Sequence, residues 1–228
     1  MFYWDPTYIL VLIGIVLSAI ASWNVSRTFK KYSRQMNSRG YTAQEVAEMI
    51  MRSAGIFDVR IEPVSGSLTD HYSPNEKVLR LSESVYNQRS VAALGVAAHE
   101  CGHAIQHKEG YAPLQLRSAS VPLANIGSTI AFPLILIGLG FSITGLAKAG
   151  VFFFLFVVLF QLITLPVEFD ASHRALKILE TNGILMGGEM SGARRVLTAA
   201  AMTYVAALLS SILQLLRLIL IVNGNRRN

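Results

Sequence analysis

The chain has 228 residues, of which 52% are hydrophobic and 15% charged, and its mean hydropathy is +0.44. A soluble domain carries about 25% charged residues, so this composition indicates contact with lipid rather than an unusually large core. The net charge of +6 comes without aromatic residues interleaved with Lys and Arg, which argues against a nucleic-acid partner, and the single cysteine excludes an intrachain disulfide.

The first apolar stretch, from about Phe2 to Val25, predicts an N-terminal transmembrane anchor over residues 1–26, because crossing a ~30 Å hydrocarbon core takes ~20 residues. A cleaved signal peptide starts with a positive segment, whereas Met1–Thr7 contains Asp5 and no Lys or Arg. A positive cluster follows the stretch instead, which is typical of an outside N-terminus with a cytoplasmic continuation. The cluster consists of Arg27, Lys30, Lys31, Arg34 and Arg39.

Residues 27–117 have the pattern of a globular α+β segment, expected in the cytoplasm. Thr42 begins a capping box, which predicts a helix over Ala43–Ala54. The alternating stretches Phe57–Pro63 and Lys77–Ser82 predict strands of a small β-sheet. The second of these is the candidate edge strand, to which an extended peptide can add through main-chain hydrogen bonds; the alternative is an ordinary internal strand.

A further helix, opened by Ser90, carries His99-Glu-Cys-Gly-His103, which matches H-E-x-x-H. Residues four apart share one face of a helix, so the two imidazoles can bind one Zn²⁺ at ~2.0–2.1 Å each. Glu100 is then the general base, because zinc lowers the pKa of a water towards ~7. The alternative is a helix whose histidines are ordinary surface or core residues; the position among small residues in mid-helix favours the metal site.

A catalytic zinc requires a third protein ligand and an open position. The metzincin spacing fails, because the chain has Gln106 and Glu109 where Gly and His are needed. His107 would have to share one ion with two ligands of its own helix, so we expect it to support a ligand or to lie at the surface. Glu168, just after an apolar segment, is the favoured third ligand; its alternative is an ordinary charge at the boundary of a membrane span.

Residues 118–167 predict a transmembrane hairpin. It comprises two apolar segments, Val121–Leu146 and Val151–Val167, and the second is a dense run of Phe, Leu and Val that ends at Pro166. Because a hairpin leaves the membrane on the side where it entered, Glu168 is expected on the side that holds the H-E-x-x-H helix.

The remainder predicts a cytoplasmic helix over residues 168–195 and a C-terminal apolar helix over residues 196–228. The last helix contains Arg217, and it either spans the membrane or lies at its interface. A full crossing would place Arg226 and Arg227 outside, against the positive-inside rule. The chain therefore has three or four expected transmembrane helices.

Three segments together resemble a known family. They are Asp70–Ser82, Ala98–Gln106 and Pro166–Ser172. They look like the neutral zinc metallopeptidases of bacterial membranes, the YugP-like family, and the resemblance covers nearly the whole chain. The chain is more distantly similar to the HtpX membrane peptidases, in which a Glu on a later helix supplies the third ligand.

The resemblance implies that Glu168 completes the zinc site. The HtpX-like peptidases carry Glu-x-x-Ala-Asp around this Glu, whereas this chain has Ser172 in place of the Asp. The orienting role of that Asp is therefore open here, since Asp170 lies two residues away and points elsewhere on a helix.

Other side chains have weaker claims to a role in chemistry. His173, Arg174 and Tyr204 are candidate donors to a developing oxyanion, but cationic residues also mark a cytoplasmic boundary without any catalytic role. Cys101, between the two histidines, is expected to be a small buried apolar residue rather than a ligand.

These observations predict a mainly α integral membrane protein with a cytoplasmic, zincin-like α+β catalytic domain in the bacterial plasma membrane. The expected activity is zinc-dependent endopeptidase cleavage of peptides or proteins, including membrane proteins. The alternative is a non-enzymatic metal-binding scaffold, and a transporter is the weaker third possibility. Nitrogen and oxygen ligands also accept Fe, Co or Mn. The sequence carries no signal for the oligomeric state.

Overall fold

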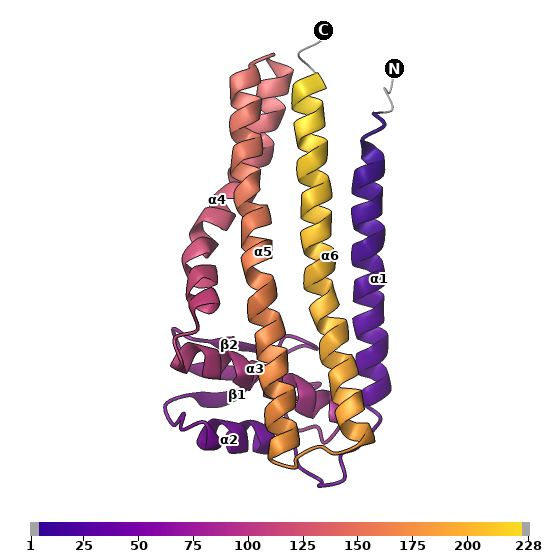
Figure 1. Cartoon of the computed structure of the whole chain (residues 1–228), viewed down its shortest axis with the longest axis vertical. Helices are drawn as coiled ribbons and strands as arrows, with labels where there is room; N and C mark the ends of the chain where they lie inside the picture. Colours follow the sequence, from indigo (N-terminus) through magenta and orange to yellow (C-terminus); the bar gives the residue numbers. More distant parts are fainter. Residues whose placement is uncertain (1–4, 225–228) are drawn as a thin grey trace. The chain divides into compact units, whose positions relative to one another are not determined.

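A computed structural model of the chain describes residues 5–224, so the predictions for Phe2, Arg226 and Arg227 fall outside the described residues. The described part is mainly helical, with one small sheet (Figure 1). Its elements, in chain order, are α1 (Tyr8–Tyr32), α2 (Ala43–Ser53), β1 (Arg60–Val64), β2 (His71–Ser73), β3 (Val78–Ser82), α3 (Val91–Lys108), α4 (Ala112–Gly140), α5 (Thr144–Thr181) and α6 (Gly188–Gly224).

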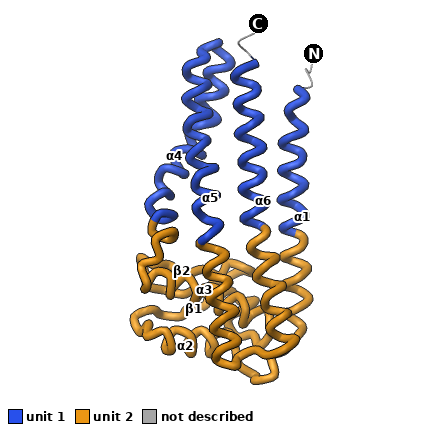
Figure 2. The backbone as a smooth tube through the Cα atoms, in the orientation of Figure 1, with its two compact units in different colours: residues 1–22, 116–166, 203–228 blue, residues 23–115, 167–202 orange. Residues whose placement is uncertain are grey.

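Four helices are long and apolar enough to cross a membrane: α1, α4, α5 and α6. The prediction of a mainly α chain with apolar spans and a small sheet is therefore confirmed. The chain divides into two compact units, coloured separately in Figure 2. Unit 1 comprises residues 1–22, 116–166 and 203–228, and unit 2 comprises residues 23–115 and 167–202.

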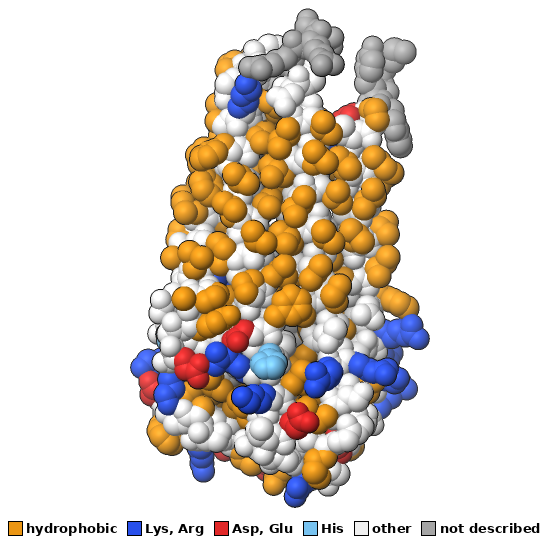
Figure 3. Space-filling view, in the orientation of Figure 1, with side chains coloured by type: hydrophobic (Ala, Val, Ile, Leu, Met, Phe, Trp, Pro, Cys, Tyr) orange, Lys and Arg blue, Asp and Glu red, His pale blue; other side chains and the backbone are white. Residues whose placement is uncertain are grey.

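Unit 1 consists of helices that expose many large apolar side chains and bury a smaller cluster, which includes Ile135, Phe154 and Leu218. Figure 3 shows hydrophobic side chains covering these helices on the visible face. Inside the unit the helices approach at small residues: a Cβ on Gly127 would lie 2.5 Å from the Phe153 carbonyl oxygen. Ser210 Oγ donates to the Gly14 carbonyl at 2.9 Å. Close backbone approach and polar contacts of this kind are what hold helices together in lipid.

The one basic residue within the last apolar segment is partnered. Arg217 lies 3.7 Å from a carboxylate oxygen of Asp5, and its guanidinium carbon is 4.2 Å from the Tyr8 ring centroid. An ion pair combined with a cation–π contact reduces the cost of a charge in an apolar helix.

α5 corrects one expectation. The single helix predicted over residues 168–195 is divided between α5, which continues through Pro166 to Thr181, and α6, which begins at Gly188. A proline in a helix interior removes one backbone donor and usually breaks the helix. Here Val167, directly after the proline, and Ala171, one turn further on, are fully buried, and their packing favours the continuous helix.

Unit 2 has its own hydrophobic core, and α3 lies within it. The capping box of α2 is present as predicted: the Glu45 amide donates to Thr42 Oγ1 at 3.2 Å, and the Thr42 amide donates to Glu45 Oε2 at 2.7 Å. Ser90 caps α3 by accepting from the Ala93 amide at 3.2 Å. Many residues of α3 are Ala or Gly, so neighbouring helices can approach it closely.

The sheet has the order β1–β3–β2, with β1 parallel and β2 antiparallel to β3. The prediction that Lys77–Ser82 forms an edge strand is wrong, because β3 pairs on both sides. β1 lies along one edge of β3 and β2 along the other, and Val78, Leu79 and Leu81 of β3 are fully buried. Edge positions belong to β1 and β2.

Candidate metal centre

Two helices of unit 2 bring together three side chains that can hold a metal ion. His99 and His103 project from one face of α3, and Glu168 projects from α5. Glu168 Oε2 lies 3.3 Å from His99 Nε2 and 3.7 Å from His103 Nε2, and the ligand atoms all lie within 4.8 Å of one another. Glu168 is 2% exposed, so the cluster is shielded from bulk water.

The distances fit a tetrahedral zinc site. Two donors at ~2.0–2.1 Å from a tetrahedral ion lie about 3.4 Å apart. The two imidazole-to-carboxylate separations of 3.3 and 3.7 Å bracket that value. Two neutral imidazoles and one carboxylate are also a donor set found in catalytic zinc sites, which leave the fourth position open. The residues present therefore fit a zinc ion.

The outer nitrogen of each imidazole has a partner that orients the ring. Ser172 Oγ lies 3.1 Å from His99 Nδ1, and Gln106 Oε1 accepts from His103 Nδ1 at 3.0 Å. A ring that carries its hydrogen on Nδ1 presents the lone pair of Nε2, which is the nitrogen that faces Glu168. Ser172, which replaces an Asp of the HtpX-like pattern, thus contacts a ring of the cluster itself.

Gln106 is fully buried and connects His103 to α5. Its amide nitrogen donates to the Val167 carbonyl and to Asp170 Oδ2, both at 2.8 Å. These two bonds fix which end of the amide faces His103, so Gln106 Oε1 is held as the acceptor. Asp170 accepts in turn from Arg174.

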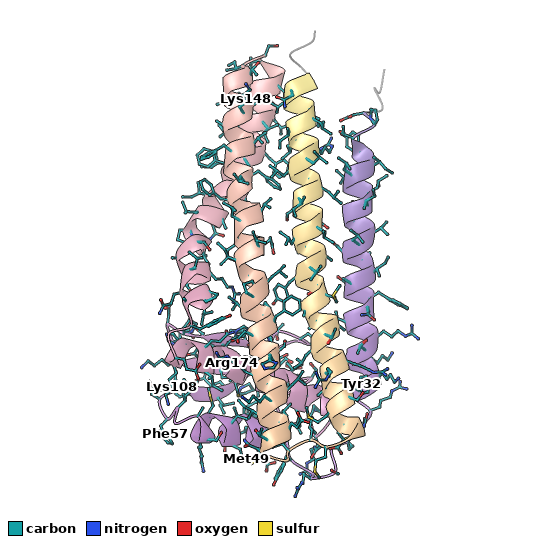
Figure 4. The ribbon with its side chains drawn as sticks, in the orientation of Figure 1. Tyr32, Met49, Phe57, Lys108, Lys148 and Arg174 are labelled. Carbon is teal, nitrogen blue, oxygen red and sulfur yellow. The ribbon has the colours of Figure 1, made fainter. Side chains whose placement is uncertain are left out.

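Arg174 belongs to this hydrogen-bond network and is not one of the side chains that can hold the metal. Its guanidinium donates to Asp170 and to Glu109, and it lies 5.6 Å from the Tyr111 ring centroid. The side chain is labelled in Figure 4, on the second half of α5. Its two carboxylate partners raise the pKa of Arg174 against the effect of burial, which is the largest influence and lowers it. As a fixed cation it holds Asp170 against Gln106.

Glu100, the predicted general base, is buried at 8% exposure on α3. Burial disfavours the charged imidazole of His103, but its contact with Glu168 and the negative charge of Glu100 outweigh burial and raise the pKa of His103 above 6.5. Glu100 also contributes to raising the pKa of Asp70, for which burial is the larger cause. Glu100 therefore lies in the electrostatic surroundings of the cluster.

Asp70 directly precedes β2 and links the start of that strand to the end of β3. Its carboxylate accepts from the Ser82 amide at 2.7 Å and from the Ser82 hydroxyl at 3.0 Å. These two residues bound the Asp70–Ser82 segment on which part of the family resemblance depends.

The other candidate residues do not join the three-residue cluster found among residues 5–224. His107 Nδ1 lies 2.8 Å from the Tyr72 hydroxyl, at a cavity beside β2. His173 is exposed and lines a different cavity with Arg174. Tyr204 belongs to unit 1, so no relation to the cluster is assigned to it.

Cys101 is fully buried and points towards α2, where its sulfur lies 3.8 Å from the Ala47 carbonyl oxygen. Burial raises the pKa of the Cys101 thiol, so the group stays protonated. The cysteine between the histidines is thus a core residue, as its type predicts.

Two features of the site were not foreseen from the residues. Gln106 was considered only as a mismatch to another ligand spacing, although it lies three residues after His103 and so shares the ligand face of α3. Gly102 permits the approach of α5: a Cβ there would lie 2.6 Å from the Ala171 carbonyl oxygen. The sequence signal for both was the helical spacing around His103.

Comparisons with known proteins agree with this geometry. The profile of a family described as "Putative neutral zinc metallopeptidase" matches residues 7–223. The chain is 46% identical over 220 residues to a Bacillus subtilis (strain 168) protein named "Putative membrane protease YugP", a match that covers 96% of this chain and 98% of that protein. No solved structure matches. The chain therefore belongs to the family described as putative neutral zinc metallopeptidases.

Proposed function

We propose that this protein is a membrane-embedded zinc endopeptidase whose metal is held by His99, His103 and Glu168. The observation that carries the proposal is the convergence of two Nε2 atoms and one carboxylate at 3.3 and 3.7 Å, from α3 and α5. The membership of the metallopeptidase family supports the same activity.

A zinc ion in this site supplies a Lewis acid that polarises a peptide carbonyl and lowers the pKa of a water. Glu100 takes the proton of the attacking water on its carboxylate. It later delivers the same proton to the amide nitrogen of the scissile bond, which leaves as an amine. Ser172 and Gln106 hold the two imidazoles with Nε2 facing Glu168 throughout the cycle.

The substrate backbone lies along an edge of the sheet. β3 is internal, so the available edges are β1 and β2, and β2 begins one residue after Asp70. A peptide added as a further strand gains main-chain hydrogen bonds with little dependence on its sequence.

We further propose that unit 2 faces the cytoplasm as a zincin-like catalytic domain. The positive cluster that follows the apolar part of α1 supports this orientation, because Lys and Arg are enriched in cytoplasmic segments. In this arrangement the four apolar helices cross the membrane, which accounts for their outward-facing apolar side chains.

The test is a set of single substitutions in the full-length protein, with zinc measured by elemental analysis and cleavage measured on casein and membrane proteins. Glu100→Gln is expected to keep one zinc and lose about 10²–10⁴-fold in activity, because it removes only the proton acceptor. His103→Ala and Glu168→Ala are expected to lose both zinc and activity.

His107→Ala serves as the matched control, since His107 lies on the same helix but bonds to Tyr72; it is expected to keep its zinc. Undiminished cleavage by Glu100→Gln would reject the mechanism. One equivalent of zinc without any cleavage by the wild type would favour the alternative, a metal-binding scaffold.

A further inference from the structure

A cavity of about 520 Å³ lies in unit 2 between the last part of α1 and the first part of α6. It is separate from the metal centre, and the proposed peptidase mechanism does not use it. Four of its lining residues are cations: Arg27 and Lys31 from α1, and Arg194 and Arg195 from α6.

None of the residues that line this cavity is acidic. Ion pairs of the described residues involve other cations, such as Arg60, Lys77 and Arg174. Four like charges around one cavity repel one another, and a bound anion would relieve that repulsion. The cavity therefore has the electrostatic character of an anion site.

The cavity has a fixed wall. Tyr32 lines it and is itself buried against α6, where Gly192 leaves the necessary room. A Cβ on Gly192 would lie 2.8 Å from Tyr32 Cδ1 and 3.0 Å from Val91 Cγ1. Figure 4 labels Tyr32 at the end of α1, beside α6. Lys31 Nζ lies 5.3 Å from the centroid of the Tyr32 ring, so the ring also helps to position a cation.

The position of the cations along α1 matches the headgroup layer of a bilayer. Exposed apolar side chains continue along this helix as far as Ile20, and Trp23, 61% exposed, follows them. Exposed tryptophan is typical of the membrane–water interface. Arg27 is four residues further on, or about 6 Å along the axis. Each headgroup layer is about 5–8 Å thick, so Arg27 lies at its depth.

α6 gives the same pattern in the opposite direction along the chain. Arg194 and Arg195 come first, then Thr198 and Met202 at the cavity, and then the apolar part of the helix. Two helices from distant parts of the sequence thus present cations to one cavity at the end of their apolar segments.

We propose that this cavity binds the phosphate-bearing headgroup of an anionic phospholipid. Arginine binds phosphate oxygens through paired, charge-assisted hydrogen bonds, and the cavity offers three arginines and one lysine. A zwitterionic headgroup carries its own cation and is a poorer match for a wall without carboxylates. The positive-inside rule accounts for the number of cations but not for their convergence on a cavity.

The test uses the full-length protein in detergent, titrated with phosphatidylglycerol or phosphatidylcholine and observed by native mass spectrometry. The double variant Arg27→Gln/Arg195→Gln removes one cation from each wall and is expected to weaken phosphatidylglycerol binding about tenfold or more. The matched control Lys30→Gln/Arg34→Gln removes two nearby charges that are exposed like Arg27 and Arg195 but do not line the cavity, and it is expected to change binding less than about threefold.

A third variant distinguishes lipid binding inside the cavity from nonspecific electrostatic attraction to the four cations. Thr198→Trp fills the space and leaves all four cations in place, and we expect it to weaken phosphatidylglycerol binding about tenfold as well. Unchanged binding in Thr198→Trp, equal losses in the two double variants, or equal binding of the two lipids by the wild type would each overturn the proposal.

Competition with inorganic phosphate shows whether the bound phosphate group belongs to a phospholipid or to a soluble molecule. If millimolar phosphate displaces phosphatidylglycerol completely, the ligand is a soluble phosphate and the lipid assignment is overturned; persistent lipid binding supports it. The peptidase-inactive variant Glu100→Gln is expected to bind phosphatidylglycerol like the wild type, so failure of either proposal can be recognised without the other.

Discussion

The two units bury apolar side chains in opposite ways. In unit 1, Leu136 of α4 is 69% exposed, whereas in unit 2 Leu179 of α5 is 0% exposed. In the most apolar stretch of α1 only 11% of residues are buried. Most large apolar side chains of unit 1 therefore face outward, around a smaller buried cluster that includes Ile135, Phe154 and Leu218. In unit 2 the same residue types form a core, as in a soluble domain.

Both units nevertheless use glycine where two helices approach closely. In unit 2, Gly102 lies against Ala171 and brings α5 to the H-E-x-x-H helix. In unit 1, Gly150 on α5 lies against Ala131 on α4. Both contacts depend on a glycine, but only the contact of Gly102 positions metal ligands. Substitutions of the two glycines should therefore have different effects on zinc binding.

Gly102→Val is expected to have the largest effect. The added side chain would meet the Ala171 backbone, where a Cβ alone lies 2.6 Å from the carbonyl oxygen, and overpacking of this kind costs about 3 kcal/mol or more. Zinc content and cleavage should both be lost. Gly150→Val, whose Cβ would lie 2.6 Å from the Ala131 carbonyl oxygen, should lower thermal stability but keep the zinc. Full zinc content in purified Gly102→Val would contradict the role assigned to the close approach.

Leu179→Ala and Leu136→Ala compare the two environments directly. Removing the fully buried side chain of Leu179 should lower the free energy of unfolding by about 2–5 kcal/mol. Leu136 is largely exposed, so its truncation should cost less than about 0.5 kcal/mol. The measurement is thermal unfolding of both variants in one detergent. Equal losses would show that unit 1 also depends on a buried core.

Gln106→Leu tests how unit 2 orients a ligand. The leucine cannot accept from His103 Nδ1 or donate to Asp170, so zinc affinity should fall about 10–100-fold, as for other residues that support metal ligands. Competition with a chromogenic chelator measures the affinity. Gln115→Leu, at an exposed glutamine, is the control and should match the wild type. An unchanged affinity in Gln106→Leu would remove the positioning role.

The smallest of the expected effects is the change of zinc affinity with pH. Burial lowers the pKa of His103, but the contact with Glu168 and the charge of Glu100 raise it above the ordinary value of a histidine, so protons compete with zinc for this imidazole as the pH falls. Affinity should fall about tenfold for each pH unit below the His103 pKa and level off above it. Titrations between mildly acidic and mildly basic pH measure this curve. A flat curve would show that His103 does not exchange a proton for the metal.

The local signals of the sequence were read correctly. Thr42 begins a capped helix, and the H-E-x-x-H segment lies on a helix that Ser90 caps. Such signals depend on neighbours within four residues, and the sequence contains them directly. The sequence also favoured Glu168 as the third ligand. Two arguments led to it: a catalytic zinc requires a third protein ligand, and the predicted hairpin returns Glu168 to the side of the H-E-x-x-H helix. In the structure the three ligand atoms lie within 4.8 Å of one another.

The misread features depend on distant partners. Pro166 is a helix breaker by type, but the buried packing of the residues that follow it keeps α5 continuous. β3 alternates in sequence like an edge strand but is paired on both sides. Asp170 was thought to point away from the site, yet it contacts Gln106, whose amide reaches across from α3. No pattern within one segment contains these relations.

The direction of Cys101 has a consequence for metal chemistry. Its thiol lies on the side of α3 that faces α2, whereas the neighbouring imidazoles face α5. A soft sulfur ligand is therefore present in the motif but withheld from the ion, and the donor set remains two nitrogens and one oxygen. Thiophilic ions such as Cu(I) gain nothing from the cysteine, and oxidants find no thiolate beside the metal.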